Sequence, residues 1–231
     1  MLIGLGYVLY ATSFIYTEVV RVIVLFYLMP VWGFLVARVF IGEPITPVRW
    51  FSMAAGVAGM LVIFDIDTGV PLPRNAGDWM ALTAGILWAF ASLMLLVDKQ
   101  TLSRDYCFML FFWGTILSIV FAAFAASQGV LGEPHWGALG DVAAWLLPFA
   151  IVVLIPAGLA TVFGPSHLNP GIVGLLFMTE ISVAVVTAAL LAGEPFGWRE
   201  IIGIALITLA GLAEPLRGLL MRSRGTHELT S

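Results

Sequence analysis

The stretch RVIVLFYLMPVWGFLVARVFIGEP, residues 21–44, is a long apolar run that ends in Gly-Glu-Pro. A second such run, GLLFMTEISVAVVTAALLAGEP at residues 174–195, ends in the same three residues. A helix that crosses a bilayer needs about 20 consecutive, mostly apolar residues, and both runs are long enough. The two stretches therefore predict two transmembrane helices that end in related turns.

The composition of the whole chain is that of a membrane protein. Of its 231 residues, 61% are hydrophobic and only 10% are charged, and the mean hydropathy is +1.05. A soluble domain carries about 25% charged residues, so the expected surroundings of this chain are a lipid bilayer. Short polar breaks predict an all-α polytopic membrane protein with eight helices, near residues 2–16, 18–41, 47–64, 78–98, 105–127, 139–162, 168–192 and 198–216.

Several classes of function lack the residues that they need. No G-x-x-x-x-G-K-[ST] loop is present for a nucleotide, and a net charge of −4 without a basic cluster does not suit nucleic acid. Three scattered histidines and the single Cys107 do not form a metal-binding pattern. The G-x-S-x-G motif of hydrolases is also missing. We therefore expect no cofactor, no metal, no nucleic-acid or nucleotide partner and no enzymatic activity.

Basic residues predict the orientation, because cytoplasmic loops of membrane proteins are enriched in Lys and Arg. If eight helices alternate and the C-terminus is cytoplasmic, the inner side receives Arg38, Arg49, Lys99, Arg104, Arg217, Arg222 and Arg224. The outer side then holds Arg74 and Arg199, with Arg21 just inside a helix end. This distribution predicts a multi-pass protein with both termini in the cytoplasm.

In this orientation the two Gly-Glu-Pro turns face opposite sides of the membrane, with five predicted helices between them. Each turn is followed by a glycine-rich helix, MAAGVAGMLVI at 53–63 and IIGIALITLAGL at 201–212. Related elements of opposite orientation are produced by an inverted repeat, which is typical of secondary transporters. We therefore expect a partial first repeat of three helices at 1–70, a complete second repeat of five helices at 71–217 and a polar cytoplasmic tail at 218–231.

Three stretches carry a resemblance to a known family: the two apolar runs above and GDWMALTAGILWAFASLMLLVDK at 77–99. They resemble EamA-type members of the drug/metabolite transporter superfamily. The resemblance implies ten helices in two inverted repeats, of which this chain holds the last eight, through N-terminal truncation or erosion of the repeat. It also implies efflux or exchange of small metabolites, amino acids or drugs across the inner membrane. One further departure is Ile181, which stands where the family usually has proline after Glu180.

Glu180 is the most informative candidate residue. It lies in the middle of the predicted helix at 168–192, where an unpaired charge costs about 2.5–3.5 kcal/mol. The side chain must be protonated, hydrated or paired. The functional hypothesis is a site that couples transport to protons or binds a substrate amine. The structural alternative is a protonated glutamate that donates a hydrogen bond between helices.

Other candidates have weaker signals. Glu18 and Arg21 share a helix face and predict a local ion pair; alternatively, Arg21 binds a substrate carboxylate or phosphate. The aromatic residues that are candidates for lining a pocket, with packed or lipid-facing positions as the alternative, are Tyr27, Trp88, Trp113 and Phe177. The residues predicted to form structural turns are Gly42, Glu43, Pro44, Gly193, Glu194 and Pro195. The acidic residues expected in a solvated linker are Asp65, Asp67 and Asp78.

The favoured function is a secondary transporter that works by alternating access on a small-molecule substrate, with proton coupling as an option. The expected partners are a small-molecule substrate, the lipid bilayer, and either a second copy of the chain in a homodimer or a second membrane protein. One alternative is a truncated, non-transporting membrane partner that stabilises or regulates a full-length transporter. A second alternative is a membrane enzyme that acts on lipids. That reading needs clustered Asp or His residues at one membrane face, and the sequence offers no such cluster.

Overall fold

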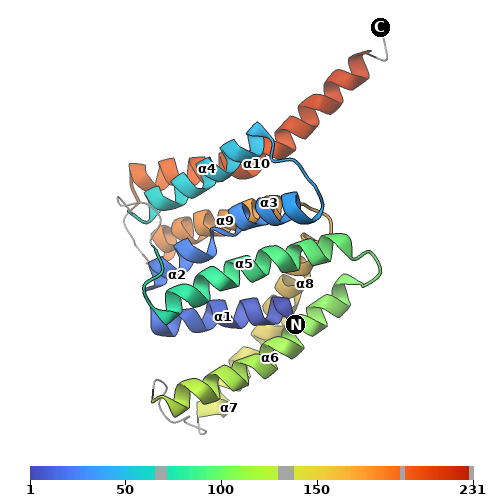
Figure 1. Cartoon of the computed structure of the whole chain (residues 1–231). Helices are drawn as coiled ribbons and strands as arrows, with labels where there is room; N and C mark the ends of the chain where they lie inside the picture. The colour runs from blue at the N-terminus through green and yellow to red at the C-terminus, as the bar shows by residue number, and fades with distance from the viewer. Residues whose placement is uncertain (66–71, 130–137, 193–195, 229–231) are drawn as a thin grey trace.

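A computed structural model describes residues 1–65, 72–129, 138–192 and 196–228 (Figure 1). Every regular element in these residues is helical, so the predicted all-α class is confirmed. In chain order the elements are α1 (Leu2–Tyr16), α2 (Val19–Phe26), α3 (Met29–Phe40), α4 (Pro47–Ile63), α5 (Ala76–Val97), α6 (Ser103–Ser127), α7 (Ala138–Phe149), the π-helical η1 (Ala150–Leu154), α8 (Ile155–Phe163), α9 (Pro170–Thr187), the π-helical η2 (Ala188–Ala192) and α10 (Trp198–Glu228).

These elements correspond to the eight predicted helices, three of which are interrupted. The stretches that are long and apolar enough to cross a membrane are Val19–Phe40, Ala76–Val97, Ser103–Ser127, Val142–Phe163 and Pro170–Leu191. Two shorter apolar helices are α1 and α4. By length and composition, these helices make the chain a multi-pass membrane protein.

The helix predicted at 18–41 is in fact two helices, because regular structure stops at Tyr27 and resumes after Leu28. Pro30 lies in the first turn of α3, where its missing N–H group is tolerated. The helix predicted to end at residue 216 continues instead to Glu228. The expected polar tail is thus helical over most of its length, and its sequence LRGLLMR at 216–222 is rich in good helix formers.

The helices pack as neighbouring pairs across the bundle. Helix α4 lies along α10, α3 along α9, and α5 along α1 and α2 (Figure 1). Glycines allow the closest approaches. A Cβ atom on Gly59 of α4 would lie 2.7 Å from the Gly203 carbonyl oxygen of α10, and one on Gly33 of α3 would lie 2.6 Å from the Gly171 nitrogen of α9. Small residues at such contacts are typical of helix packing in membranes.

The buried core lies among α3, α4, α5, α9 and α10, and its fully buried large side chains include Phe34, Met60, Leu95, Met178 and Ile207. The periphery is α6 and the Val142–Phe163 stretch. Only 17% of the apolar stretch of α6 and 11% of that of Val142–Phe163 are buried. The corresponding share is 50% for Val19–Phe40 and for Ala76–Val97. The candidate site is therefore to be sought on the core side of the bundle.

Candidate functional site

The break between α2 and α3 places Tyr27 halfway along its membrane span. The Tyr27 side chain is buried, and its backbone N–H donates to the Ile23 carbonyl at 2.9 Å, which ends α2. Its hydroxyl donates a hydrogen bond to the Oε2 atom of Glu180 at 2.7 Å. This bond joins the α2–α3 break to the middle of α9.

Two cavities meet at this hydrogen bond, and together they are called the central cavity. The first has a volume of about 230 Å³, the second about 280 Å³, and both are lined by Tyr10, Tyr27 and Glu180. The first is mainly aromatic, with the rings of Tyr7, Tyr10, Phe26, Tyr27, Trp88 and Phe177. The second is mainly aliphatic apart from the shared residues, with Ile23, Ile181, Ala184 and Val185 among its walls.

The aromatic walls come from different helices. The rings of Trp88 on α5 and Phe177 on α9 have centroids 5.7 Å apart. The centroid of the Tyr10 ring on α1 lies 4.1 Å from that of the Phe26 ring on α2. The structure thus brings three of the predicted pocket aromatics, those at positions 27, 88 and 177, to one cavity.

Trp113, the fourth predicted pocket aromatic, does not line the central cavity. It lies on α6 and packs against Gly4 of α1. A Cβ atom added to Gly4 would lie 3.0 Å from the Trp113 Cβ atom. Its ring is perpendicular to that of Phe112, with centroids 5.6 Å apart. Apolar periodicity identifies aromatics in the middle of a helix but does not show which side of the helix faces the cavity.

Glu180 provides the charge in the central cavity. Its side chain is exposed, and no Lys, Arg or His occurs among the residues that line either cavity. The other titratable side chains on the walls are Tyr7, Tyr10 and Tyr27. The site therefore combines one carboxylate with neutral hydroxyl groups and aromatic rings.

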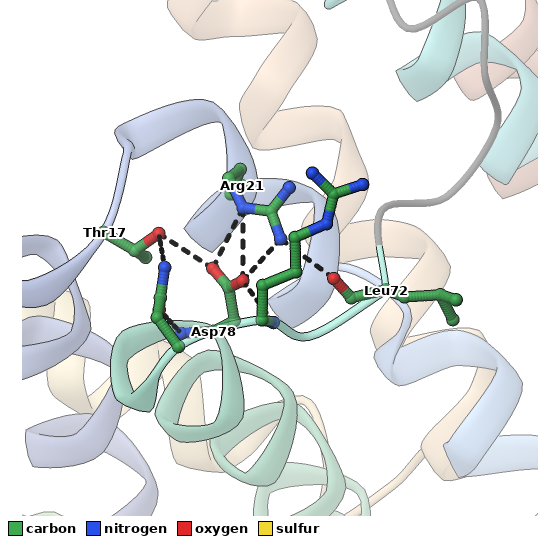
Figure 2. A network of polar contacts seen from close by, with 6 residues as sticks. Thr17, Arg21, Leu72 and Asp78 are labelled. Carbon is green, nitrogen blue, oxygen red and sulfur yellow. Dashed lines mark hydrogen bonds and ion pairs between the residues drawn. The ribbon is translucent and has the colours of Figure 1, made fainter.

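Arg21 does not line the central cavity. Its guanidinium is held by Asp78, as Figure 2 shows. Its Nε atom donates to both carboxylate oxygens of Asp78, at 3.1 and 3.2 Å, and its Nη2 atom also contacts Oδ2. The same Nη2 atom donates to the Leu72 carbonyl at 2.9 Å. The guanidinium is thus already bound by a carboxylate and a carbonyl, which weakens its candidacy for a substrate anion.

The Asp78 side chain is fully buried at the start of α5. It accepts further hydrogen bonds from the Thr17 hydroxyl at 2.8 Å and the Arg74 backbone N–H at 2.9 Å. Asn75 caps α5 by accepting from the Asp78 backbone N–H at 2.8 Å, and its Nδ2 atom donates to Thr17 at 3.0 Å. Thr17, Arg21, Asn75 and Asp78 are called the outer cluster.

Two sequence predictions are wrong here. Glu18 does not pair with Arg21; its side chain is exposed and it lies just before α2. Asp78 is not in a solvated linker but in the first turn of α5, where a carboxylate also interacts favourably with the helix dipole. Local spacing favoured the near neighbour, whereas the fold brings the distant carboxylate to the guanidinium. Asp65 is exposed and pairs with Arg199 at 3.0 Å, and Asp67 lies outside the described residues.

A second polar network lies at the opposite end of the spans. The Arg49 Nη1 atom lies 2.7 Å from Glu43 Oε2, and its Nε and Nη2 atoms lie 3.0 and 2.9 Å from Glu214 Oε1. The Asn169 side chain donates to the same Glu43 oxygen, and the guanidinium lies over the Phe34 ring, 5.4 Å from its centroid. Glu43, Arg49, Asn169 and Glu214 are called the inner cluster.

Glu43 therefore does more than form a turn. Gly42 has a φ of +71°, a left-handed conformation that suits glycine, and the Pro44 carbonyl accepts from Arg49 Nη1 at 3.1 Å. The turn thus aims Glu43 at Arg49. The other predicted turn, Gly193, Glu194 and Pro195, lies outside the described residues. Asn169 and Glu214 were not among the predicted site residues, because polar residues at helix ends have many structural roles.

Comparison with known proteins identifies the N-terminal part of the chain. Residues 1–65 match the model of the EamA-like transporter family. The resemblance inferred from sequence is thereby confirmed for these residues, which are similar to membrane transporters of the drug/metabolite type. No curated protein matches the chain.

Twelve chains of solved structures are similar to this fold. One of them, a crystal structure, superposes with a TM-score of 0.65 at 17% identity, over 95% of this chain and 76% of the other. At that identity the likeness shows the fold alone. No group of three or more His, Cys, Asp or Glu side chains in the described segments forms a metal-binding arrangement.

Proposed function

We propose that this protein is a secondary transporter of small molecules that works by alternating access around the central cavity. The observation that carries the proposal is the Glu180 carboxylate, which lies midway along the Pro170–Leu191 span and accepts a hydrogen bond in the central cavity from Tyr27, at the break of a second span. Interrupted helices beside a midplane binding site are typical of secondary transporters. The proposal includes placement in the inner membrane with both termini cytoplasmic.

The positions of the two polar clusters support alternating access. The outer cluster joins Arg21, from the predicted 1–70 repeat, to Asp78 from the predicted 71–217 repeat. At the other end, the inner cluster joins Arg49 to Glu214 across the same division. The cavity lies between two sets of ion pairs, and opening one set while the other stays closed would expose the cavity to one side at a time.

Helix pairing also supports an inverted-repeat arrangement. In the predicted repeats, α3 corresponds to α9 and α4 to α10, since each helix lies beside a Gly-Glu-Pro turn. The structure packs α3 on α9 and α4 on α10. Pairing of corresponding elements is the arrangement expected around a pseudo-two-fold axis in the membrane plane.

In this scheme the hydrogen bond from Tyr27 connects Glu180 to the α2–α3 break. A hydrogen bond to an ionised carboxylate is stronger than one to a neutral acid. Binding of a proton or a cation at Glu180 would therefore weaken its bond to the Tyr27 hydroxyl. Because Tyr27 lies at the α2–α3 break, the occupancy of the carboxylate would change the restraint on that break.

The test is transport in proteoliposomes that contain the purified full chain. A panel of cationic, zwitterionic and anionic small molecules is offered under an imposed proton gradient, and uptake is measured by mass spectrometry while a trapped dye reports lumen pH. We expect pH-dependent uptake of at least one class, and its loss in the Glu180→Gln variant.

The matched control is Glu18→Gln, which makes the same chemical change at an exposed residue outside the central cavity. This variant should transport as the native protein does. Uptake by Glu180→Gln that equals native uptake at every pH would reject the coupling role. Uptake no greater than that of empty liposomes for the whole panel would reject the transporter.

A further inference from the structure

We propose that the central cavity binds small organic cations, with Glu180 as the counter-charge and the surrounding aromatic rings as the cage. This inference rests on the proposed function, because it names the substrate class of the same site. Three observations carry it: the sign of the charge in the cavity, the disposition of the basic residues and the identity of the walls.

The charge of the cavity favours a cation. Its ionisable groups are the Glu180 carboxylate and the three tyrosine hydroxyls at positions 7, 10 and 27. The hydrogen bond that the structure gives to the carboxylate comes from the neutral Tyr27 hydroxyl and engages Oε2. A carboxylate in the middle of a membrane span is stabilised by a cation and repels an anion.

Three of the basic residues at the two ends of the bundle already have carboxylate partners. Arg21 pairs with Asp78, Arg199 with Asp65, and Arg49 with both Glu43 and Glu214. Each of these pairs lies outside the central cavity. An anionic substrate bound in the cavity would therefore find no counter-charge on its walls.

The walls match the other requirement for a cation. Ammonium groups bind over the faces of aromatic rings, and quaternary ammonium ions are recognised by cages of several such rings. Tyr10, Tyr27, Trp88 and Phe177 line the same cavity as Glu180. Volumes of about 230 and 280 Å³ set the size of the ligand at that of a small ammonium ion with one ring or a short chain.

Competition with protons follows from this arrangement. The titratable groups that face Glu180 are Tyr7 and Tyr10 from α1 and Tyr27 from the α2–α3 break, while the cavity walls on α5, α8 and α9 add no other charged group. The charge of the site thus depends on Glu180. Affinity for a cation should fall as the pH falls, because the protonated acid no longer offers a negative charge.

The test is a binding measurement that does not depend on transport. Phenyltrimethylammonium is titrated by calorimetry into the full chain in an uncharged detergent, with benzenesulfonate as the anionic counterpart of similar size. We expect saturable binding of the cation and none of the anion. Glu180→Gln should weaken cation binding about tenfold and make it independent of pH, since the amide carries no charge and the cavity walls hold no other carboxylate.

Two further variants separate charge from structure. Phe177→Leu keeps the carboxylate but removes one ring and should weaken binding about two- to fivefold. Glu18→Gln should leave the affinity unchanged. If Glu180→Gln does not elute as a folded monodisperse protein, two other measurements test the proposal. These are the fall in cation affinity of the native chain at low pH and the weaker binding of the Phe177→Leu variant.

The outcomes distinguish this inference from the proposed function. Unchanged cation affinity in folded Glu180→Gln, or binding of benzenesulfonate as tight as that of the cation, would overturn the cation site. Transport of anionic or neutral compounds without cation binding would overturn it too and leave the transporter standing. Cation binding that behaves as expected, with no uptake in proteoliposomes, would leave the site standing and overturn the transporter.

Discussion

The outer and inner clusters both join distant segments through an arginine, but they differ in charge balance and in access to water. In the outer cluster one arginine meets one carboxylate, and the side chains of Arg21 and Asp78 are 18% and 0% exposed. In the inner cluster Arg49 is shared by Glu43 and Glu214, which are 35% and 25% exposed. The outer cluster is therefore balanced and desolvated, while the inner one carries an excess carboxylate and is partly hydrated. We infer that the inner end opens more easily.

The largest expected effect is that of Asp78→Asn. Removal of one partner from a buried ion pair leaves the other charge uncompensated, so this change should lower the free energy of unfolding by about 3 kcal/mol. Thermal and denaturant unfolding of the purified protein in detergent measure it. Asp65→Asn is the matched control, because its pair with Arg199 is exposed on both sides. It should cost less than about 1 kcal/mol. Equal losses in the two variants would show that burial is not what distinguishes the outer cluster.

Arg49→Gln should have the next largest effect. It leaves Glu43 and Glu214 facing one another without a cation, and we expect a loss of about 2 kcal/mol in the free energy of unfolding. Glu43→Gln should lose only about 1 kcal/mol, because Arg49 keeps its bonds to Glu214. The same unfolding measurements apply. A larger loss in Glu43→Gln than in Arg49→Gln would contradict the shared-arginine description.

Salt should weaken the ion pairs of the inner cluster more than that of the outer cluster, by a smaller amount than the substitutions above. Raising the ionic strength from 0.1 M to 1 M shortens the Debye length from about 10 to about 3 Å, which screens hydrated pairs far more than buried ones. Double-mutant cycles at both salt concentrations give the coupling energies of Arg49 with Glu214 and of Arg21 with Asp78. The first should fall by roughly half and the second should stay within error. Parallel changes would mean that the two clusters are equally hydrated.

The smallest expected effect is that of Asp98, at the end of α5 opposite to Asp78. Asp98, just after α5, accepts hydrogen bonds from the hydroxyls of Tyr106 and Thr101 and from the Gln100 backbone N–H, and these lower the pKa of its carboxyl below the ordinary 3.8. Since the folded pKa is depressed, the stabilisation is present above pH 3.8 and is lost as the pH falls further. The melting temperature of the native protein should therefore decline more between pH 5 and pH 3 than that of Asp98→Asn. Identical slopes would assign the acid sensitivity to other carboxylates.

The helices themselves were predictable from sequence because the signal for a membrane helix is local. The length of each apolar run fixes a span, and the helix predicted at 47–64 is observed at Pro47–Ile63. Glu180 was also accessible to sequence reasoning, since a charge in the middle of an apolar run is conspicuous. Its hydrogen bond to Tyr27 was not, because that contact depends on how α9 lies against the α2–α3 break.

The polar clusters were beyond sequence reasoning for the same reason. Arg21 had a carboxylate three residues away at Glu18, and only the packing of α2 on α5 shows that Asp78 is its partner. Arg49 and Glu214 likewise meet only because α4 lies along α10. Periodicity describes the faces of single helices, whereas pairing between charges depends on the three-dimensional arrangement of several helices.

Helix α10 is longer than a membrane span requires. Its 31 residues span about 46 Å at 1.5 Å per residue, whereas the hydrocarbon core of a bilayer is about 30 Å thick. The C-terminal part of α10 extends away from the bundle as a straight arm (Figure 1). Because the same helix lies along α4, which bears Arg49, any tilt of α10 relative to the bundle is magnified at the tip of the arm. A fluorophore attached near Glu228 would thus report, by energy transfer to labelled lipid headgroups, whether the inner end is open or closed.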